Sequence, residues 1–204
     1  PANLKEIGDV AFFKSGIQEV IFEKGSELET IGKYAFDNCD KLKAVTIPAG
    51  LEEIGEGAFS YTGLKEVIFE EGSLLEVIRN AAFRGCTRLQ MVTLPPKLKK
   101  IGRFAFAFSG IEEVIFEGCL LEIIDGYAFS GRNNLKTINI PPGVVIETGA
   151  FDDTGCSGDT DIFAPGATIV DCTKQEETKG VCSNENVSSK QAANAEEGFT
   201  ADEL

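Results

Sequence analysis

The sequence predicts a repeat solenoid, a superhelix of stacked coils of 22 to 24 residues with one short parallel strand each. An Ala-Phe or similar pair recurs along the chain, and an Ile stands five residues before each Phe. A fixed period in the twenties is typical of solenoids, in which each coil buries its apolar side against its neighbours. The recurring residues are Phe12, Phe36, Phe59, Phe83, Phe106, Phe129 and Phe151, preceded by Ile7, Ile31, Ile54, Ile78, Ile101, Ile124 and Ile146.

Each of these phenylalanines is followed by a short run of the form Leu/Ile-x-x-Val/Ile-x-apolar, for example Leu42-Val45-Ile47. Branched residues that alternate over so few positions predict one strand per coil, and stacked coils would join these strands in a parallel sheet. Links such as "PAG" at 48–50 and "PPG" at 141–143 then end each strand. Because Pro and Gly turn the chain away from a sheet, we expect mainly turns, or short strands, on the other face.

The coils are of two alternating kinds, so the true repeating unit is a pair of coils with a period of 47 residues from Phe12 to Phe59 to Phe106. One kind has a short turn containing Gly16, Gly63 or Gly110 and a strand that ends in "VIFE". The other has a longer turn, such as "DNCDKL" or "RGCTRL", and a strand that ends in "TIP" or "TLP". Tandem duplication of a two-coil unit is the simplest origin.

Residues 31–59, "IGKYAFDNCDKLKAVTIPAGLEEIGEGAF", resemble the BspA-like (Treponema-type) leucine-rich repeat. The family pattern is Ile-Gly-x-x-Ala-Phe, then Cys, then Leu-x-x-Ile-x-Ile-Pro, and the resemblance extends from residue 1 to about 165. It implies a right-handed leucine-rich repeat superhelix that serves recognition, often at cell surfaces, without catalysis. The "VIFE" coils depart from the pattern because they lack both the Cys and the Pro.

The two ends of the chain differ from the middle. "PANLKEIGDVAF" aligns with "PAGLEEIGEGAF" at 48–59. We therefore expect about seven coils in an array that is truncated at its N-terminus and begins without a capping segment. Either further coils precede it or another molecule covers its apolar end. The coil around Phe151 is degenerate, and we place the end of the solenoid at residue 165. Residues 166–204 are expected to form a C-terminal cap and an acidic, largely irregular tail.

The composition argues against several classes of function. A net charge of -14 would repel a phosphate backbone, so nucleic acid is not an expected partner. The chain has no His, which removes the Ser-His-Asp and Cys-His catalytic sets and the commonest metal ligand. No run of 18 apolar residues predicts a membrane span. We therefore expect no enzyme, no metal site and no cofactor.

The cysteines divide into two groups. Cys39 and Cys86 occupy equivalent turns two coils apart, about 10 Å by strand spacing, and are expected to be small buried residues. Cys119 has no obvious partner. A bridge between Cys172 and Cys182 would staple the C-terminal coil, with Cys156 as a rival partner. Together with a glycosylation acceptor at Asn186, these cysteines favour an extracellular or other oxidising compartment.

The candidate binding residues lie on the open face of the predicted sheet. In each "EVIFE" strand Val and Phe point inward, so that Glu, Ile and Glu point outward. A concave face with a stripe of Ile and Thr between carboxylates would suit a protein partner with a basic and apolar surface. The alternative interpretation is that this face is only exposed to solvent and that its residues repeat because the two-coil unit was duplicated. The candidates are Glu19, Ile21, Glu66, Ile68, Met91, Thr93, Glu113 and Ile115.

Two functions remain in competition. The first is a non-catalytic recognition module that binds another protein through its concave face. The second is a structural or accessory subunit of a larger assembly, in which neighbouring chains cover the open end and the tail.

Overall fold

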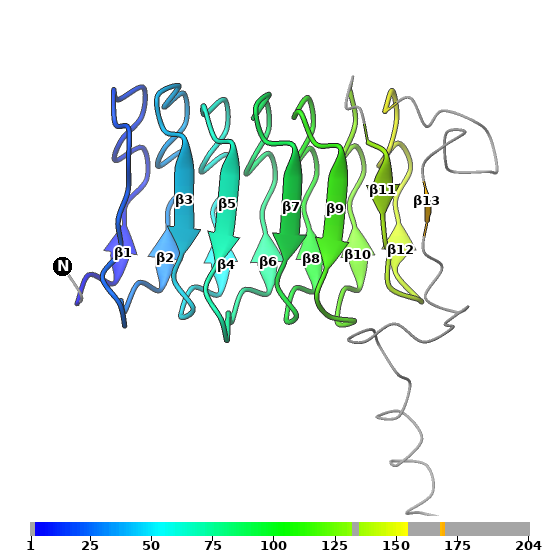
Figure 1. The fold of residues 1–204 in the computed structure, drawn as a ribbon, viewed down its shortest axis with the longest axis horizontal. Helices are drawn as coiled ribbons and strands as arrows, with labels where there is room; N and C mark the ends of the chain where they lie inside the picture. The colour runs from blue at the N-terminus through cyan, green and yellow to red at the C-terminus, as the bar shows by residue number, and fades with distance from the viewer. Residues whose placement is uncertain (1–2, 132–134, 155–167, 170–204) are drawn as a thin grey trace, which may run out of the picture.

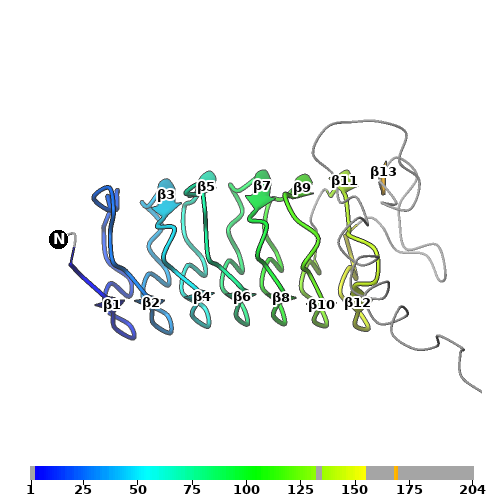
Figure 2. The same cartoon turned by 90° about the horizontal axis from the view of Figure 1, so that it is seen from below.

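The computed structural model describes residues 3–131, 135–154 and 168–169 of the chain. It confirms the predicted solenoid: the coils stand side by side in an almost straight row (Figure 1, Figure 2). The described residues form strands and turns and contain no helix, hence none long and apolar enough to cross a bilayer. Each coil runs up through a strand of two residues, turns, and runs down the opposite side of the stack (Figure 1).

One side of the stack is a seven-stranded parallel sheet in the order β1-β2-β4-β6-β8-β10-β12, here called the short-strand sheet. Each strand is a dipeptide that ends on the repeat Ile, which is buried in every coil except the last described one. The sequence pattern allowed short strands here, and the structure shows that they run through the whole array. They are β1 (Glu6–Ile7), β2 (Thr30–Ile31), β4 (Glu53–Ile54), β6 (Val77–Ile78), β8 (Lys100–Ile101), β10 (Ile123–Ile124) and β12 (Val145–Ile146).

The opposite side carries the predicted strands, and we call it the long-strand face. Its strands form two parallel groups, β3-β5 and β7-β9-β11-β13. They are β3 (Ala44–Ile47), β5 (Glu66–Phe69), β7 (Met91–Leu94), β9 (Glu113–Phe116), β11 (Thr137–Ile138) and β13 (Thr168–Ile169).

The core between the two sides is the predicted ladder of phenylalanines. The ring centroids of successive repeat phenylalanines lie 5.1 to 5.4 Å apart, and the ring planes are within 7° of parallel. The five inner rings are fully buried, whereas Phe12 in the first coil is 39% exposed because it has a neighbour on one side only. Backbone bonds join the same turns: the amide of Phe83, for instance, donates to Ala105 O at 2.7 Å.

The turn around each Phe contains two residues in the left-handed backbone region, two positions before and two positions after the ring. This conformation costs an L-residue other than Gly about 1 to 2 kcal/mol, yet several positions hold aromatic residues. Contacts between coils offset the cost. The Tyr34 ring lies on Gly57 of the next coil and the Tyr61 ring on Gly85, where a side chain would overlap the ring.

Some details differ from the sequence-based expectations. The strand predicted at 19–23 is reduced to a single bridge between Val20 and Val45, at the end of the stack where pairing comes from one side. Cys39 and Cys86 are free and buried, as predicted, and their thiols donate to carbonyls of the preceding coil. The expectation for Cys119 was wrong, since this residue is disulfide-bonded.

The C-terminal predictions fall mostly outside the described residues, including those for Cys156, Cys172, Cys182 and Asn186. The short strand β13 lies beyond the predicted solenoid boundary at residue 165. It pairs with β11, Thr137 beside Thr168 and Ile138 beside Ile169, and so extends the long-strand face by one strand (Figure 1).

Candidate functional site

The outward side chains of the long-strand face fall into two rows set by parallel pairing. Val67, Val92 and Val114, which lie between the rows, are buried, so the burial follows the predicted alternation. Met91 is 53% exposed and Ile68 is 44% exposed, which is unusual for large apolar side chains on a sheet with polar neighbours. The first row contains Ala44, Glu66, Met91, Glu113 and Thr137, and the second contains Thr46, Ile68, Thr93 and Ile115.

Pairing on this face alternates with the two-coil period. Where a "TIP" or "TLP" strand precedes a "VIFE" strand, as in β3-β5 and β7-β9, four residues pair in register. In the opposite order the pairing is weaker: two residues between β9 and β11, and no ladder between β5 and β7. The number of residues from the repeat Phe to the following long strand also alternates. Glu66, the first residue of β5, follows Phe59 by seven residues, and Met91, the first residue of β7, follows Phe83 by eight.

A groove of about 300 Å³ lies over the break between β5 and β7. Four of the eight predicted binding residues line it: Glu66 and Ile68 from β5, Met91 and Thr93 from β7. The structure therefore brings together candidates that are about 25 residues apart in the sequence. The apolar residues Val67, Ile68, Phe69 and Met91 line the groove together with Glu66, Thr93 and Glu117.

The carboxylates of this face have different roles. Glu70 was expected to point outward in a second column, but its Oε2 accepts a hydrogen bond of 3.1 Å from the amide of Ala49 in the preceding coil. Glu112 pairs with Lys136 at 2.7 Å. Neither Glu66 nor Glu117 takes part in an ion pair within the described residues. These two carboxylates are therefore the ones in the groove that can receive an external cation.

The other four candidates lie outside the groove. Glu19 and Ile21 belong to the first coil, where Ile21 is 77% exposed. Glu113 and Ile115 are half-buried in β9, next to β7. Between β9 and β11, where two residues pair, a side chain extends the contact, because the amide of Phe116 donates to Asn139 Oδ1 at 3.1 Å.

Three groove residues were not among the candidate binding residues: Val67, Phe69 and Glu117. Val67 was expected in the core, and Glu117 was expected to point outward on this face but was not chosen as a candidate. Phe69 was assigned to the core, but it is half-buried and lines the groove. It does so at the side of β5 that has no strand pairing with β7. Glu117 is exposed and comes from β9's end, one coil beyond Met91. The alternating path lengths in the sequence are a signal that could have indicated unequal strand pairing.

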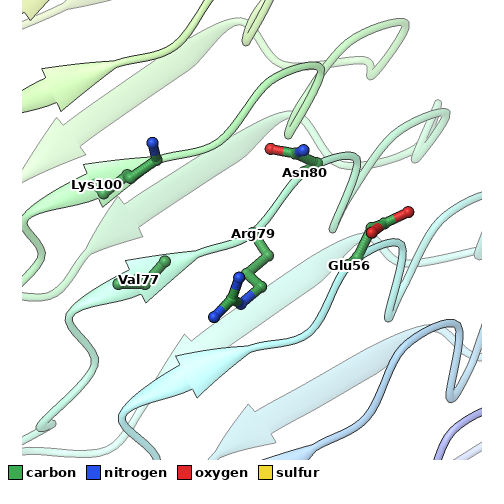
Figure 3. A pocket seen from close by; sticks show the side chains of 5 residues that line it. All are labelled: Glu56, Val77, Arg79, Asn80 and Lys100. Atoms are coloured by element: carbon green, nitrogen blue, oxygen red, sulfur yellow. The ribbon is translucent and has the colours of Figure 1, made fainter.

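A second hollow, of about 390 Å³, lies on the short-strand sheet and is lined by residues of three neighbouring coils: Glu56, Val77, Arg79, Asn80 and Lys100 (Figure 3). Its charges are already paired between coils. Arg79 pairs with Glu53, Lys33 with Glu56 at 2.9 Å, and Lys100 with Asp125 at 2.8 Å.

These ion pairs shift the pKa values of the side chains that form them. The hydrogen bond from Lys33 lowers the pKa of Glu56, and the bond to Glu56 in turn raises the pKa of Lys33. Ion pairs of this exposed kind hold coils together weakly and leave little net charge for a ligand. Among the described residues no three His, Cys, Asp or Glu side chains converge as a metal site. The groove on the long-strand face is therefore the candidate site.

A stack of coils with a buried phenylalanine ladder and one parallel strand per coil on the long-strand face is the fold of a leucine-rich repeat protein, a class that suggests protein interaction or surface recognition. The sequence pattern of the BspA type leucine rich repeat region matches in six copies, over residues 1–74 and 72–164. The chain belongs to this family. No curated protein sequence matches it significantly.

One solved structure supports the fold, and two further ones are similar in sequence. The pneumococcal vaccine antigen PcpA is 28% identical, with a TM-score of 0.60 over 76% of this chain and 47% of that one. A leucine rich cell surface protein from Faecalibacterium prausnitzii A2-165 is 24% identical over 74% of this chain and 46% of that one, with a TM-score of 0.47. A leucine-rich repeat protein from Bacteroides ovatus ATCC 8483 is 25% identical over 79% and 46%, with a TM-score of 0.45. The chain thus spans about half the length of these proteins.

Proposed function

We propose that the protein is a non-catalytic recognition module that binds a partner protein across its long-strand face, with the groove between β5 and β7 as the anchor. The observation that carries this proposal is the meeting of Glu66, Ile68, Met91 and Thr93 around one groove. Exposed apolar side chains at the centre of a face, with polar groups around them, are the usual arrangement of an interaction site.

The chemistry of the groove favours a Lys or Arg side chain of the partner. The aliphatic stem of such a residue packs on Ile68 and Met91, and its charged end meets Glu66 and Glu117. The excess of acidic residues, with a net charge of -14, would steer a basic partner toward the protein and accelerate association.

We place the protein at a cell surface or in another oxidising environment. The family resemblance supports this location, and so does the disulfide at Cys119, because structural disulfides persist in oxidising compartments.

A permanent structural subunit of a larger assembly is the second candidate, and it would bury the exposed Ile68 and Met91 of the long-strand face against a neighbouring chain. Native mass measurement separates the candidates, since a freely soluble monomer supports recognition and a fixed stoichiometry with other chains supports the structural role.

The groove is tested by selecting peptides from a random library on the immobilised full chain and measuring their binding kinetics. Peptides with Lys or Arg beside apolar residues should be selected. Glu66→Lys and Glu117→Lys should slow their association and flatten its salt dependence. Glu71→Lys, the same charge reversal at an exposed residue of the following loop, is the matched control. Equal binding to the parent and to both groove variants would remove the groove from consideration.

A further inference from the structure

The turns around the repeat phenylalanines, which follow the short strands, carry a second cluster of side chains that is separate from the groove. Its centre is the guanidinium of Arg84, which lies 5.5 Å from the ring centroids of both Phe104 and Phe108 and 6.0 Å from that of Tyr61. Arg103 lies over Phe104 and Tyr127 at 5.0 and 5.3 Å. Two cations are thus held by four rings that come from three coils, and the whole cluster spans four consecutive coils.

The rings are held in place and remain accessible. Tyr61 lies on Gly85 and Phe108 lies on Gly131, so each ring rests on the backbone of the next coil. Tyr61 is nevertheless 47% exposed and Phe108 is 48% exposed. Aromatic residues and Arg are enriched at protein interfaces, and Tyr and Arg are among the residues most often found at their energetic centres.

Arg84 and Arg103 have aromatic rings as partners. Neither forms an ion pair within the described part of the chain, where six Lys or Arg residues form one and others, such as Lys65 and Arg88, do not. In addition, Nε of Arg84 is buried and has no hydrogen-bond partner there. An unsatisfied buried donor is costly, which indicates a group from outside the described residues.

This cluster is not a by-product of duplication. The position of Arg84, directly after the repeat Phe, is occupied in the other inner coils by Asp37, Ser60, Ala107 and Ser130. The backbone frame repeats, and the arginine occurs in one coil only. A residue that occurs in only one coil, on a backbone that all coils share, would give that part of the solenoid its own binding specificity.

We propose that this aromatic-arginine edge, formed by Tyr61, Arg84, Arg103, Phe104, Phe108 and Tyr127, binds a protein segment that carries a carboxylate next to apolar or aromatic residues. A carboxylate accepts hydrogen bonds from a guanidinium in bidentate geometry, and the flanking apolar side chains cover the ring faces. A peptide fits better than a glycan because Phe104 and Phe108 offer no hydrogen-bonding groups to sugar hydroxyls. The same turn carries Arg88, which lines a hollow together with Gln18, Asp40, Lys41 and Lys43.

The test selects peptides from a random library on the immobilised full chain and then compares the affinity of each selected peptide for the parent protein and for its variants. Peptides with Asp or Glu beside Phe, Leu or Pro should lose about tenfold or more in affinity for Arg84→Gln, and their affinity should fall with added salt. Phe108→Gly should weaken the same peptides while keeping the fold, because the equivalent positions in neighbouring coils are Gly85 and Gly131 with a left-handed backbone.

Arg79→Gln is the matched control, since Arg79 is an arginine of the same coil that is already paired with Glu53 on the short-strand sheet. Glu66→Lys should leave acidic peptides bound, which separates this edge from the groove. Acidic peptides that bind Arg84→Gln and Arg79→Gln equally would overturn the proposal, as would a selection without acidic binders. Binding of a uronic-acid glycan that depends on Arg84, with no acidic peptide bound, would also overturn it in favour of a carbohydrate ligand.

Discussion

The rings of Phe83 and Phe106 lie parallel in neighbouring coils, with their centroids 5.2 Å apart and their planes 6° from parallel. Phe83 makes a similar contact with Phe59 on its other side, at 5.4 Å. All three rings are fully buried. The stack is therefore a continuous apolar column, and each inner ring contributes to two interfaces between coils.

Replacing Phe83 by Ala should lower the free energy of unfolding by about 3 to 5 kcal/mol, because it leaves a cavity in the middle of this column. Urea unfolding followed by circular dichroism measures the change. Phe12→Ala should cost less, since Phe12 is partly exposed and stacks on one side only. A loss below about 0.5 kcal/mol for Phe83→Ala would contradict the role of the column.

The ladder could be predicted from the sequence because periodicity records burial directly. A residue that every coil must bury recurs in every coil, as Phe83 and Ile78 do. The groove could be predicted only in part. The outward phase of Glu66, Ile68 and Met91 follows from alternation, but the break between β5 and β7 depends on how two coils of different shape stack, which no single coil encodes.

The aromatic-arginine edge could not be predicted for a different reason. Tyr61 and Phe108 occupy left-handed turn positions where Gly or Asn is expected, so a sequence pattern assigns them to irregular loops. Only the contact between a ring and the glycine of the next coil explains why an aromatic residue is tolerated there. That contact joins residues 23 to 24 positions apart, as between Tyr61 and Gly85.

The pair Tyr34 and Gly57 tests this contact. The Tyr34 ring is held by a hydrogen bond of 2.9 Å from its hydroxyl to Glu56 Oε1, and Gly57 lies under the ring with φ +61°. Gly57→Ala should lower the free energy of unfolding by about 2 to 5 kcal/mol, since it adds backbone strain and overlaps the ring. In a Tyr34→Gly background the overlap disappears and the cost of the same substitution should fall to about 1 to 2 kcal/mol. An equal cost in both backgrounds would show that the ring does not constrain Gly57.

The buried thiol of Cys86 predicts a pH dependence at the alkaline side. Burial raises the pKa of Cys86 to about 11, from an ordinary value of 9.0, although a hydrogen bond with Thr62 works in the opposite direction. In the unfolded chain the thiol ionises near its ordinary value, so stability is fully present below about pH 9 and declines as the pH rises toward 11. The loss attributable to this thiol is about 2 to 3 kcal/mol.

Denaturant unfolding of the parent and of Cys86→Ala between pH 8 and pH 11 isolates this effect, because lysines titrate equally in both proteins. The parent should lose more stability over this interval than the variant does. The native thiols of Cys39 and Cys86 should also resist a thiol reagent at pH 8 until the protein is unfolded. Parallel pH profiles for the two proteins would mean that Cys86 ionises in the folded state.

The break between β5 and β7 should close when an asparagine is introduced at Thr93. Asn139 occupies the equivalent position in the coil two further along, where its side chain accepts the amide of Phe116 and joins β9 to β11. Phe69 is the equivalent of Phe116, and its amide faces β7 by the same alternation, because the next amide, that of Glu70, donates to β3. Thr93→Asn should therefore stabilise the protein by about 0.5 to 1.5 kcal/mol and narrow the groove.

This substitution changes no charge, so it separates the shape of the groove from its electrostatics. Basic peptides selected on the parent should bind Thr93→Asn more weakly, with a faster dissociation rate and an unchanged salt dependence of association. Thr46→Asn places the same residue at the equivalent position of another coil and should leave their binding as it is in the parent. If Thr93→Asn raises stability and still binds the peptides as the parent does, the groove closes without consequence, and the anchor must lie elsewhere on the long-strand face.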